Sequence, residues 1–304
     1  MEETVNGGSQ HDEPRGTNGQ VGDPGSSETD AGGLGRTGMD GIPLGFARMS
    51  AERDAVRYNM SHKQRGHCAI FNHRHFDEHT GLGERNGTDR DRDQAQALFT
   101  NLGFQVTVHN NLRVYEIKEK LQDLAFDVNH SECDALVVVF MSHGEKDVLW
   151  GRDGTFNPDY LFENFKADQC PTLAGKPKLF FIQACRGEKL DAGTTLKQDD
   201  IDAGSQAYYK IPNAADFLEC WSTVPGHYSW RNPANGSWFI QSLVKVLTQD
   251  SAHDDLLSMM TSVNRNLILN FESFCPYEQV MHRKKQAACI VSTLMRKVYF
   301  TPKY

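Results

Sequence analysis

The residue with the clearest chemical potential is Cys185, which follows the apolar run at residues 178–182 and precedes Gly187 by two positions. Such a run is typical of a buried strand, and open α/β sheets bind their ligands beyond the carboxyl ends of the strands. A thiol in that position is a candidate nucleophile. Taken alone, Cys185 could equally be a buried cysteine that packs as a small apolar side chain.

A histidine follows a second apolar run in the same way. Residues 134–141 are continuously apolar after Asp134 and end directly before Ser142-His143-Gly144-Glu145. Two buried strands would therefore deliver His143 and Cys185 to one edge of a sheet. An imidazole beside a thiol can hold the thiolate or protonate a departing amine, and the backbone amides of Gly144 and Cys185 could stabilise an oxyanion. A lone histidine is more often structural, but the matched strand ends favour catalysis.

The surrounding segments predict alternating strands and amphipathic helices that would position this pair. Apolar residues share one helical face in three places: Ala95, Leu98 and Leu102; Val114, Ile117, Leu121 and Leu124; Leu256, Met260, Val263 and Leu267. A further helix is expected at residues 239–247, and a last strand starts at residues 288–291. Alternating strands and helices predict a mainly parallel sheet with helices on both sides.

The first 50 residues differ from the rest of the chain. They hold 12 of the 26 glycines and a single aromatic residue, Phe46. A segment of this composition cannot bury a core, so we expect it to be disordered. With 304 residues in total, one α/β domain with an unstructured tail fits as well as two domains.

Composition narrows the class of protein. The net charge of −8 argues against a nucleic-acid surface. No apolar run of about 18 residues and no leader is found, so neither a membrane span nor a signal peptide is expected. The seven cysteines form no disulfide framework and no zinc pattern, which suits a cytoplasmic location. No cofactor and no metal are expected, since His73 and His75 alone are a weak metal signal.

The motifs together resemble the caspase family. The resemblance is carried by QACRG at residues 183–187 and SHGE at 142–145, with further segments in family order at residues 68–72, 85–89, 175–179, 228–232 and 236–239. It covers residues 55–301. It implies a three-layer α/β/α sandwich around a mostly parallel six-stranded sheet.

The resemblance also implies an activity. A caspase of the effector (executioner) type is a cysteine endopeptidase of apoptosis that cleaves after aspartate through an acyl-enzyme. Cys185 would attack the carbonyl, His143 would protonate the leaving amine, and the carbonyl near Gly83 would orient the imidazole. The alternative is a catalytically silent regulator on the same fold, which the presence of both His143 and Cys185 disfavours. A flavodoxin-like binder is disfavoured because no glycine-rich phosphate loop follows the first strand.

By the same resemblance, Arg85, Gln183 and Arg231 would form the pocket for the aspartate. Guanidinium groups bind a carboxylate through paired, charge-assisted hydrogen bonds. An isolated arginine is more often part of a surface ion pair. Related enzymes that cleave after basic residues need acidic pocket walls instead, and two arginines would repel their substrates.

An aromatic loop would supply the outer subsites. The resemblance implies that Tyr228 and Trp230 hold the residue before the aspartate, that Ser229 binds the substrate backbone, and that three residues line the subsite three positions before the aspartate: Asn232, Trp238 and Phe274. Clustered aromatic residues more often form a core. Met281 replaces an aromatic residue of better-known family members, so the preference of the outer subsites stays open.

The tripeptide Asp-Ala-Gly occurs at Asp30, Asp191 and Asp202. Cleavage of a zymogen after Asp30 and Asp202, by an upstream initiator caspase and by the enzyme itself, would give a prodomain (residues 1–30), a large subunit (31–202) and a small subunit (203–304). Cleavage after Asp40 or Asp191 stays open. The family implies a homodimer of processed subunits and, through a new amino terminus at Ala31, binding to inhibitor-of-apoptosis proteins.

Overall fold

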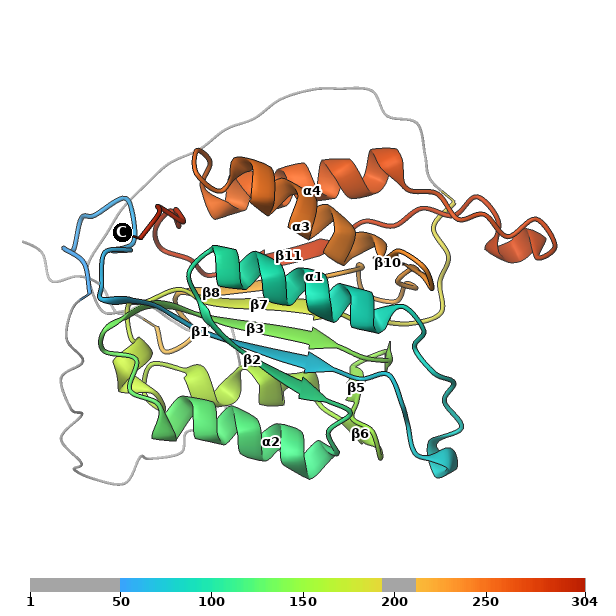
Figure 1. Ribbon diagram of the computed structural model, residues 1–304, viewed down its shortest axis with the longest axis horizontal. Helices are drawn as coiled ribbons and strands as arrows, with labels where there is room; N and C mark the ends of the chain where they lie inside the picture. The colour runs from blue at the N-terminus through green and yellow to red at the C-terminus, as the bar shows by residue number, and fades with distance from the viewer. Residues whose placement is uncertain (1–49, 193–211, 304) are drawn as a thin grey trace, which may run out of the picture. The chain divides into compact units, whose positions relative to one another are not determined.

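The computed structural model describes residues 50–192 and 212–303. Its central six-stranded sheet has the order β11-β8-β7-β3-β1-β2 (Figure 1). The strands are β1 (Gln64–Asn72), β2 (Gln105–Asn110), β3 (Cys133–Met141), β7 (Lys178–Gln183), β8 (Phe217–Trp221) and β11 (Cys289–Ser292). Neighbouring strands run parallel except β8 and β11, which are antiparallel. The prediction of a mostly parallel six-stranded sheet is confirmed.

Helices cover both faces of the sheet, as expected for a three-layer α/β/α sandwich (Figure 1). One face carries α1 (Thr88–Asn101), α3 (Trp238–Asp250) and α4 (Leu256–Asn270). The other carries α2 (Val114–Gln122), a π-helical turn at Asp123–Asp127 and 3₁₀ helices at Pro158–Leu161, Glu163–Phe165 and Pro171–Leu173. Because both faces are covered, β3 and β7 are buried over their whole length and are therefore almost continuously apolar.

The helical faces predicted from the sequence pack against the sheet. Ala95 and Leu98 of α1 are buried, whereas Leu102 follows the end of the helix and is half-buried. Ile117 and Leu121 are the buried residues of α2, and the last residue of that stripe, Leu124, lies in the π-helical turn. The stripe of α4 is buried throughout.

Small elements complete the chain around the carboxyl ends of the strands. They are the short strands β4 (Gly144–Glu145), β5 (Val148–Trp150), β6 (Thr155–Phe156), β9 (Arg231–Asn232) and β10 (Gly236–Ser237), and 3₁₀ helices at Glu78–Thr80 and Gln279–Met281. Within residues 50–192 and 212–303, none of the helices has the length and apolar character needed to cross a bilayer.

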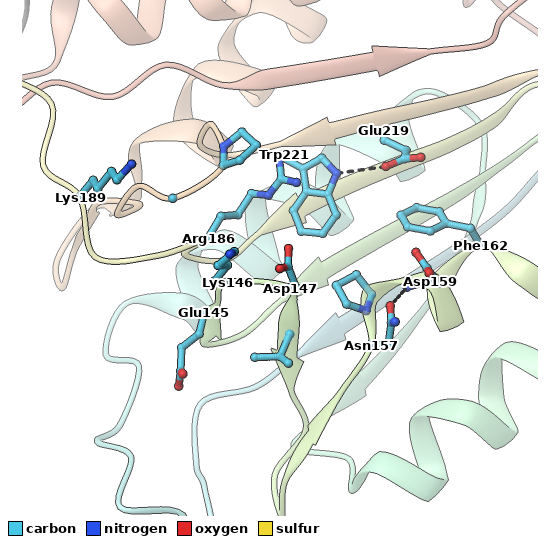
Figure 2. Close-up of a pocket in the computed structure, with 14 residues that line it drawn as sticks. Glu145, Lys146, Asp147, Asn157, Asp159, Phe162, Arg186, Lys189, Glu219 and Trp221 are labelled. Atoms are coloured by element: carbon cyan, nitrogen blue, oxygen red, sulfur yellow. Dashed lines mark hydrogen bonds between the residues drawn. The ribbon is translucent and has the colours of Figure 1, made fainter. Parts of the chain in front are cut away.

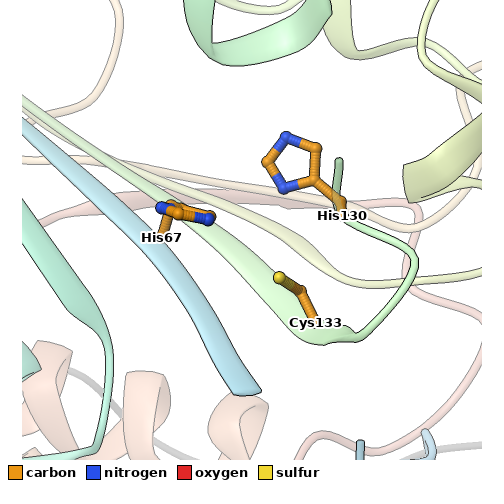
Figure 3. Close-up of side chains that lie close together, drawn as sticks. All are labelled: His67, His130 and Cys133. Carbon is orange, nitrogen blue, oxygen red and sulfur yellow. The ribbon is translucent and has the colours of Figure 1, made fainter. Parts of the chain in front are cut away.

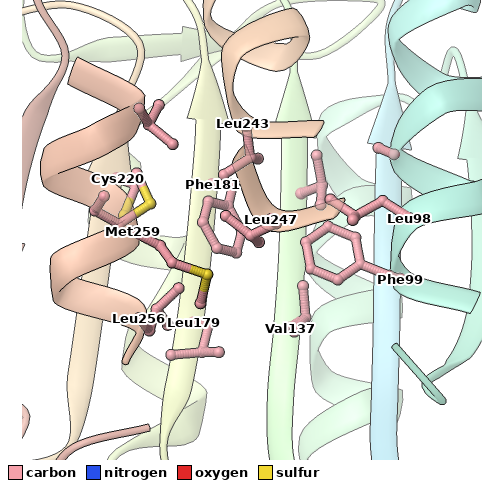
Figure 4. Close-up of a cluster of buried hydrophobic side chains, with 14 of the residues drawn as sticks. Leu98, Phe99, Val137, Leu179, Phe181, Cys220, Leu243, Leu247, Leu256 and Met259 are labelled. Carbon is pink, nitrogen blue, oxygen red and sulfur yellow. The ribbon is translucent and has the colours of Figure 1, made fainter. Parts of the chain in front are cut away.

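Segments on both sides of the predicted cleavage at Asp202 share one core. Figure 4 shows Phe99, Val137 and Phe181 from the earlier part of the chain packed with Leu243 and Leu247 from α3. Strands β8 and β11 also belong to the later part, yet they extend the sheet beyond β7. Asp202 itself, Asp30 and the predicted prodomain lie outside the described residues.

Candidate active site

The pairing of β3 with β7 brings the candidate nucleophile and base to one edge of the sheet. Met141 is opposite Gln183 in the parallel register, and the amide of Ser142 donates to the carbonyl of Gln183 at 3.1 Å. His143 and Cys185 each stand two residues beyond that matched pair. The sequence analysis expected two strand ends to meet at one edge of the sheet. They do so because β3 and β7 are adjacent and parallel.

Gly144 packs directly against the backbone of the nucleophile. A Cβ atom at this position would lie 2.5 Å from the carbonyl oxygen of Cys185 and 3.0 Å from the Cβ of Ala184. Only glycine therefore fits between the end of β3 and the Cys185 loop. The backbones of Gly144 and Cys185 therefore lie side by side.

His143 is oriented by a backbone carbonyl. Its Nε2 lies 2.9 Å from the carbonyl oxygen of Gly83, and the ring of Phe76 contacts the imidazole with centroids 4.8 Å apart. A carbonyl only accepts, so Nε2 carries the proton and Nδ1 keeps its lone pair. Burial lowers the pKa of His143 to about 4, and the positive charges of Arg85 and Arg231 act in the same direction.

The thiol of Cys185 rests against the backbone of Ser229. The Ser229 amide donates to Sγ at 3.3 Å, and Sγ lies 3.8 Å from the Ser229 carbonyl oxygen. Burial raises the pKa of Cys185, while the Ser229 amide, Arg85 and Arg231 oppose that shift. Together with the low pKa of His143, this makes the resting pair a neutral thiol and a neutral imidazole. Among the described residues, no hydrogen bond joins the two side chains.

Two arginines stand beside this pair. Arg85 is buried, and its Nη1 donates to the carbonyl of His73 at 2.9 Å and to Oγ1 of Thr88 at 2.8 Å. Arg231 is half-buried, and its Nε donates to the carbonyl of Asn86 at 2.8 Å. The other guanidinium donors of both side chains have no acceptor among the described residues. Burial and then the charge of Arg231 lower the pKa of Arg85 to about 9, which shows how poorly the cation is compensated.

A carboxylate that the sequence analysis missed lies behind the arginines. Asp91 is fully buried in α1, and its Oδ1 accepts the amide of Ser237 at 2.7 Å. Burial raises the pKa of Asp91 to about 6, and the charges of Arg85 and Arg231 oppose that shift. The sequence contains a signal for this residue, because Asp91 lies on the same helical face as Ala95. A carboxylate on a buried face needs a buried partner.

Ser229 is held by two glutamines. Gln183 is buried and donates through Nε2 to Oγ of Ser229 at 2.7 Å, and its Oε1 has no partner among the described residues. Gln286 is also buried, and its Nε2 donates to Oγ of Ser229 at 3.4 Å and to the carbonyl of Ser222 at 2.7 Å. Its Oε1 accepts the amide of Trp230 at 2.7 Å. Gln183 was predicted as a pocket residue. Gln286 was missed, because nothing in its local sequence marks it.

The structure brings together some of the predicted outer-subsite residues. Trp230 stacks on Trp238 with centroids 5.6 Å apart, and Trp238 stacks on Phe271 at 5.5 Å. Phe274 lies apart from this stack: it is 81% exposed, and its ring contact within the described residues is with His282. Phe271, which the sequence analysis did not single out, is the third member of this stack, and Phe274 is left exposed outside it.

The remaining predicted residues line the same loop. Tyr228 is half-buried and its amide donates to the carbonyl of Lys189 at 3.0 Å. Asn232 is exposed, and its Oδ1 accepts the amides of Ala234 and Asn235. Its side chain thus holds the turn between β9 and β10.

A separate cavity of about 740 Å³ lies beside the Cys185 loop (Figure 2). None of its lining residues is a predicted catalytic or substrate-binding residue. Arg186, next to the nucleophile, points into it, and its guanidinium lies 4.3 Å from the ring centroid of Trp221. Trp221 in turn donates to the carboxylate of Glu219 at 3.1 Å. The candidate nucleophile is therefore held on one side by the backbone of Ser229 and on the other by the contact of the adjacent Arg186 with Trp221.

Comparisons with known proteins agree with this geometry. The sequence profile of the family described as "Caspase domain" matches residues 65–299. The chain belongs to the caspase family. It is 46% identical to Caspase-1 of Spodoptera frugiperda, covering 86% of this chain and 87% of that protein. It is 43% identical to Caspase drICE of Drosophila melanogaster, covering 84% and 76%.

A solved structure shows the same fold. The crystal structure of Caspase-1 from Spodoptera frugiperda superposes with a TM-score of 0.79 at 46% identity, covering 85% of this chain and all of that one. The present chain is an aspartate-specific cysteine protease of the effector type, which executes apoptosis. Such enzymes act on protein substrates as dimers of processed subunits. The alternative of a catalytically silent regulator is not favoured.

The fit of Gly144 can be tested by adding one methyl group. In Gly144→Ala the new Cβ would press on the Cys185 carbonyl, and a displacement of about 1 Å at the nucleophile costs roughly 100-fold in rate. We expect kcat/KM to fall by about that factor while circular dichroism stays unchanged. Gly154→Ala is the matched control, since nothing lies within 4 Å of its added Cβ. Equal losses in both variants would contradict this role.

The neutral resting pair predicts a pH profile for the thiol. A raised pKa means that thiolate forms only at higher pH, so alkylation of Cys185 by iodoacetamide should keep accelerating above about pH 8.5, where an ordinary thiol is half ionised. Mass spectrometry of the Cys185 peptide measures the rate. Arg231→Gln removes a cation that favours thiolate and should move the profile to still higher pH. A plateau reached below pH 8.5 would refute the neutral pair.

Proposed function

We propose that Cys185 and His143 carry out acyl transfer from a neutral pair. As Sγ of Cys185 attacks the carbonyl carbon after aspartate, its proton passes to Nδ1 of His143, the nitrogen left free by the Gly83 contact. The amides of Gly144 and Cys185 stabilise the oxyanion. The carbon–nitrogen bond then breaks as His143 protonates the amine, and water, deprotonated by His143, hydrolyses the thioester and restores the thiol.

The two arginines support the assignment of the primary pocket. Arg85 and Arg231 are poorly compensated cations with spare donors, and both act on the charge of Cys185. An aspartate carboxylate would supply the missing counter-charge beside the scissile bond, with Gln183 completing the pocket. These two cations beside Cys185, with one buried carboxylate, Asp91, behind them and spare donors in front, are the observation that carries the proposal.

Cleavage of matched peptides tests the pocket and the nucleophile separately. Peptides that differ only in aspartate, asparagine or lysine before the scissile bond are compared with wild type and Cys185→Ala. We expect asparagine to be cleaved roughly 10⁴-fold less efficiently than aspartate, because it leaves two cations unpaired. Cys185→Ala should be inactive on all three.

Controls separate the pocket from general effects of charge. Arg231→Gln should lose activity on the aspartate peptide, while Arg265→Gln, an exposed arginine of α4, should retain it. Equal cleavage by wild type and Cys185→Ala would rule out the nucleophile. Cleavage after lysine would rule out the pocket.

Ser229 is proposed to bind the substrate backbone next to the scissile bond. Its carbonyl oxygen lies 3.8 Å from Sγ, so the amide of an aspartate bound to Sγ would come within reach of that carbonyl. Substrate would then extend along the loop past Trp230 and Trp238, adding as a short strand. Tyr228 and Trp230 would contact the residue before the aspartate, and Asn232, Trp238 and Phe274 the subsite three positions before it. The exposure of Phe274 leaves it free to cover bound substrate.

Activation is proposed to follow cleavage after Asp30 and Asp202, by an upstream initiator caspase and then by the enzyme itself. Asp191, the other Asp-Ala-Gly site of the large subunit, is a poorer candidate, because its carbonyl accepts the amide of Lys285 at 3.0 Å in a β-bridge. A protease needs an extended, free segment. We therefore propose residues 1–30, 31–202 and 203–304 as prodomain, large subunit and small subunit.

Amino-terminal sequencing of activated protein tests this division. We expect fragments that begin at Ala31 and Ala203. Asp202→Ala should stay a single chain after treatment with an initiator caspase, whereas Asp191→Ala should be processed normally. Fragments that begin at other residues, or normal processing of Asp202→Ala, would overturn the assignment.

Processing after Asp30 would create a partner site. An exposed amino-terminal Ala31 is a feature that inhibitor-of-apoptosis proteins bind in members of the family. Binding of the processed enzyme, measured by calorimetry, should be weakened in Ala31→Met and kept in Gly32→Ala. Equal affinity of wild type and Ala31→Met would exclude this partner mode.

A cytoplasmic location is supported by the cysteines. All seven are free thiols in the structure, as expected in a reducing compartment. Recovery of the protein in a membrane or secreted fraction after cell fractionation would contradict this location.

A further inference from the structure

A second group of reactive side chains lies at the end of the sheet opposite the catalytic edge. His67 of β1, His130 and Cys133, the first residue of β3, come together there (Figure 3). One ligand atom of each residue lies within 4.8 Å of the others. Ten residues separate Cys133 from His143, which at about 3.3 Å per residue places this cluster roughly 30 Å from the catalytic base.

Local structure explains why the three residues meet. His130 and Cys133 are joined by a tight turn in which the Cys133 amide donates to the His130 carbonyl at 2.9 Å. The His-x-x-Cys spacing resembles the paired ligands of small zinc sites. Gly66 lets β1 approach β3 just before His67: its φ is +123°, and a Cβ there would overlap the carbonyl oxygen of Ala135. The approach of the two strands therefore depends on glycine at this position.

The imidazole of His130 is prepared to bind a cation. The ring is fully buried, and Nε2 lies 2.8 Å from the carbonyl oxygen of Leu124. Because the carbonyl only accepts, Nε2 carries the proton and Nδ1 presents a lone pair. Nδ1 has no hydrogen-bond partner among the described residues. Metal-binding histidines usually donate their second nitrogen to a carbonyl in this way, which fixes the ring.

The other two donors are also available. His67 is half-buried, and its side chain makes no hydrogen bond within the described part of the chain, while its ring meets that of His130 edge-on at 5.6 Å. Sγ of Cys133 has only a weak contact, at 3.6 Å, with Oε1 of Gln64. No partner would have to be displaced at high cost.

Charges of both signs lie near the cluster. Lys176 is buried and donates to the carbonyls of His130 and Ser131 at 2.6 Å, so it opposes a bound cation. Glu132 and Asp134, which flank Cys133 in the sequence, carry the opposite charge. A bound ion has to replace the proton of the buried Cys133 thiol.

We propose that His67, His130 and Cys133 bind one Zn²⁺ ion, with water as the fourth ligand. Two imidazoles and a thiolate suit zinc, whereas Mg²⁺ and Ca²⁺ prefer oxygen. Zinc bonds of about 2.0–2.3 Å place tetrahedral ligand atoms roughly 3.5 Å apart. Contraction of the cluster by about 1 Å is needed, and the half-buried ring of His67 can rotate to provide it. Its exposure also gives water access to the ion.

Binding would link β1 to the turn that begins β3 without touching the catalytic cleft. The ion therefore acts on the stability of the sheet and leaves the Cys185 pocket unoccupied. The sequence analysis expected no metal, and its candidates, His73 and His75, are not part of this cluster. The two local ligands are visible in the sequence, but the third comes from a different strand.

Cobalt binding to the full chain in a Cys185→Ala background tests the site, because the catalytic thiol then cannot contribute. One equivalent of Co²⁺ should produce a sulfur-to-cobalt charge-transfer band, and Zn²⁺ should displace it. Zinc should also raise the Tm of this protein. Cys133→Ser should abolish the band, and His67→Ala should weaken cobalt binding by more than about 100-fold, the upper range found for supporting residues of metal sites.

Matched variants outside the cluster complete the design. Cys275→Ser, a half-buried thiol, and His253→Ala, an exposed imidazole, should retain the band and the rise in Tm. Circular dichroism establishes that each variant is folded, and the half-buried His67→Ala keeps the test valid if Cys133→Ser does not fold. Absence of the band in Cys185→Ala, or its survival in Cys133→Ser, would overturn the proposal.

Discussion

The parallel pairing of β3 with β7 is the constraint on which the site depends. Nothing in the local sequence holds His143 near Cys185, and both residues lie beyond the last paired positions of their strands. Their proximity follows from the register, which places Met141 opposite Gln183. Gly144 then allows the two strand ends to approach closely. A shift of one residue in the register would separate the proposed base from the proposed nucleophile.

Electrostatics couple the proposed pocket to the proposed catalytic pair. Arg85 and Arg231 favour the thiolate of Cys185 and disfavour the protonated form of His143. A substrate carboxylate between the arginines would cancel both effects. His143 would become a better base at the moment when substrate arrives, and Cys185 would remain a thiol until it attacks. Occupancy of the pocket by aspartate would thus contribute to the proton transfer as well as to binding.

The sequence predicts those features that depend on repeated local patterns. The buried strands β3 and β7 and the helix stripes could be recognised because full burial on two faces, or on one helical face, dictates which residue types occur. Contacts made only by tertiary packing could not be predicted. Gln286 meets Trp230 across 56 residues, and Phe271, which no local pattern marks, stacks on Trp238. Asp91 lies between these two cases. Its position on an apolar helical stripe is visible in the sequence, but the residues that it meets are not.

Ser229 makes the nucleophile and the substrate loop one hydrogen-bonded unit. Its backbone contacts Sγ of Cys185, while Gln183 and Gln286 hold its side chain. Gln183 belongs to β7 and Gln286 to the segment before β11, so the loop is fixed by strands that lie on either side of β8. Substrate bound as proposed to the Ser229 backbone would change the environment of the thiol. Ser229 would then couple substrate recognition to activation of the proposed nucleophile, in addition to the charges of the arginines.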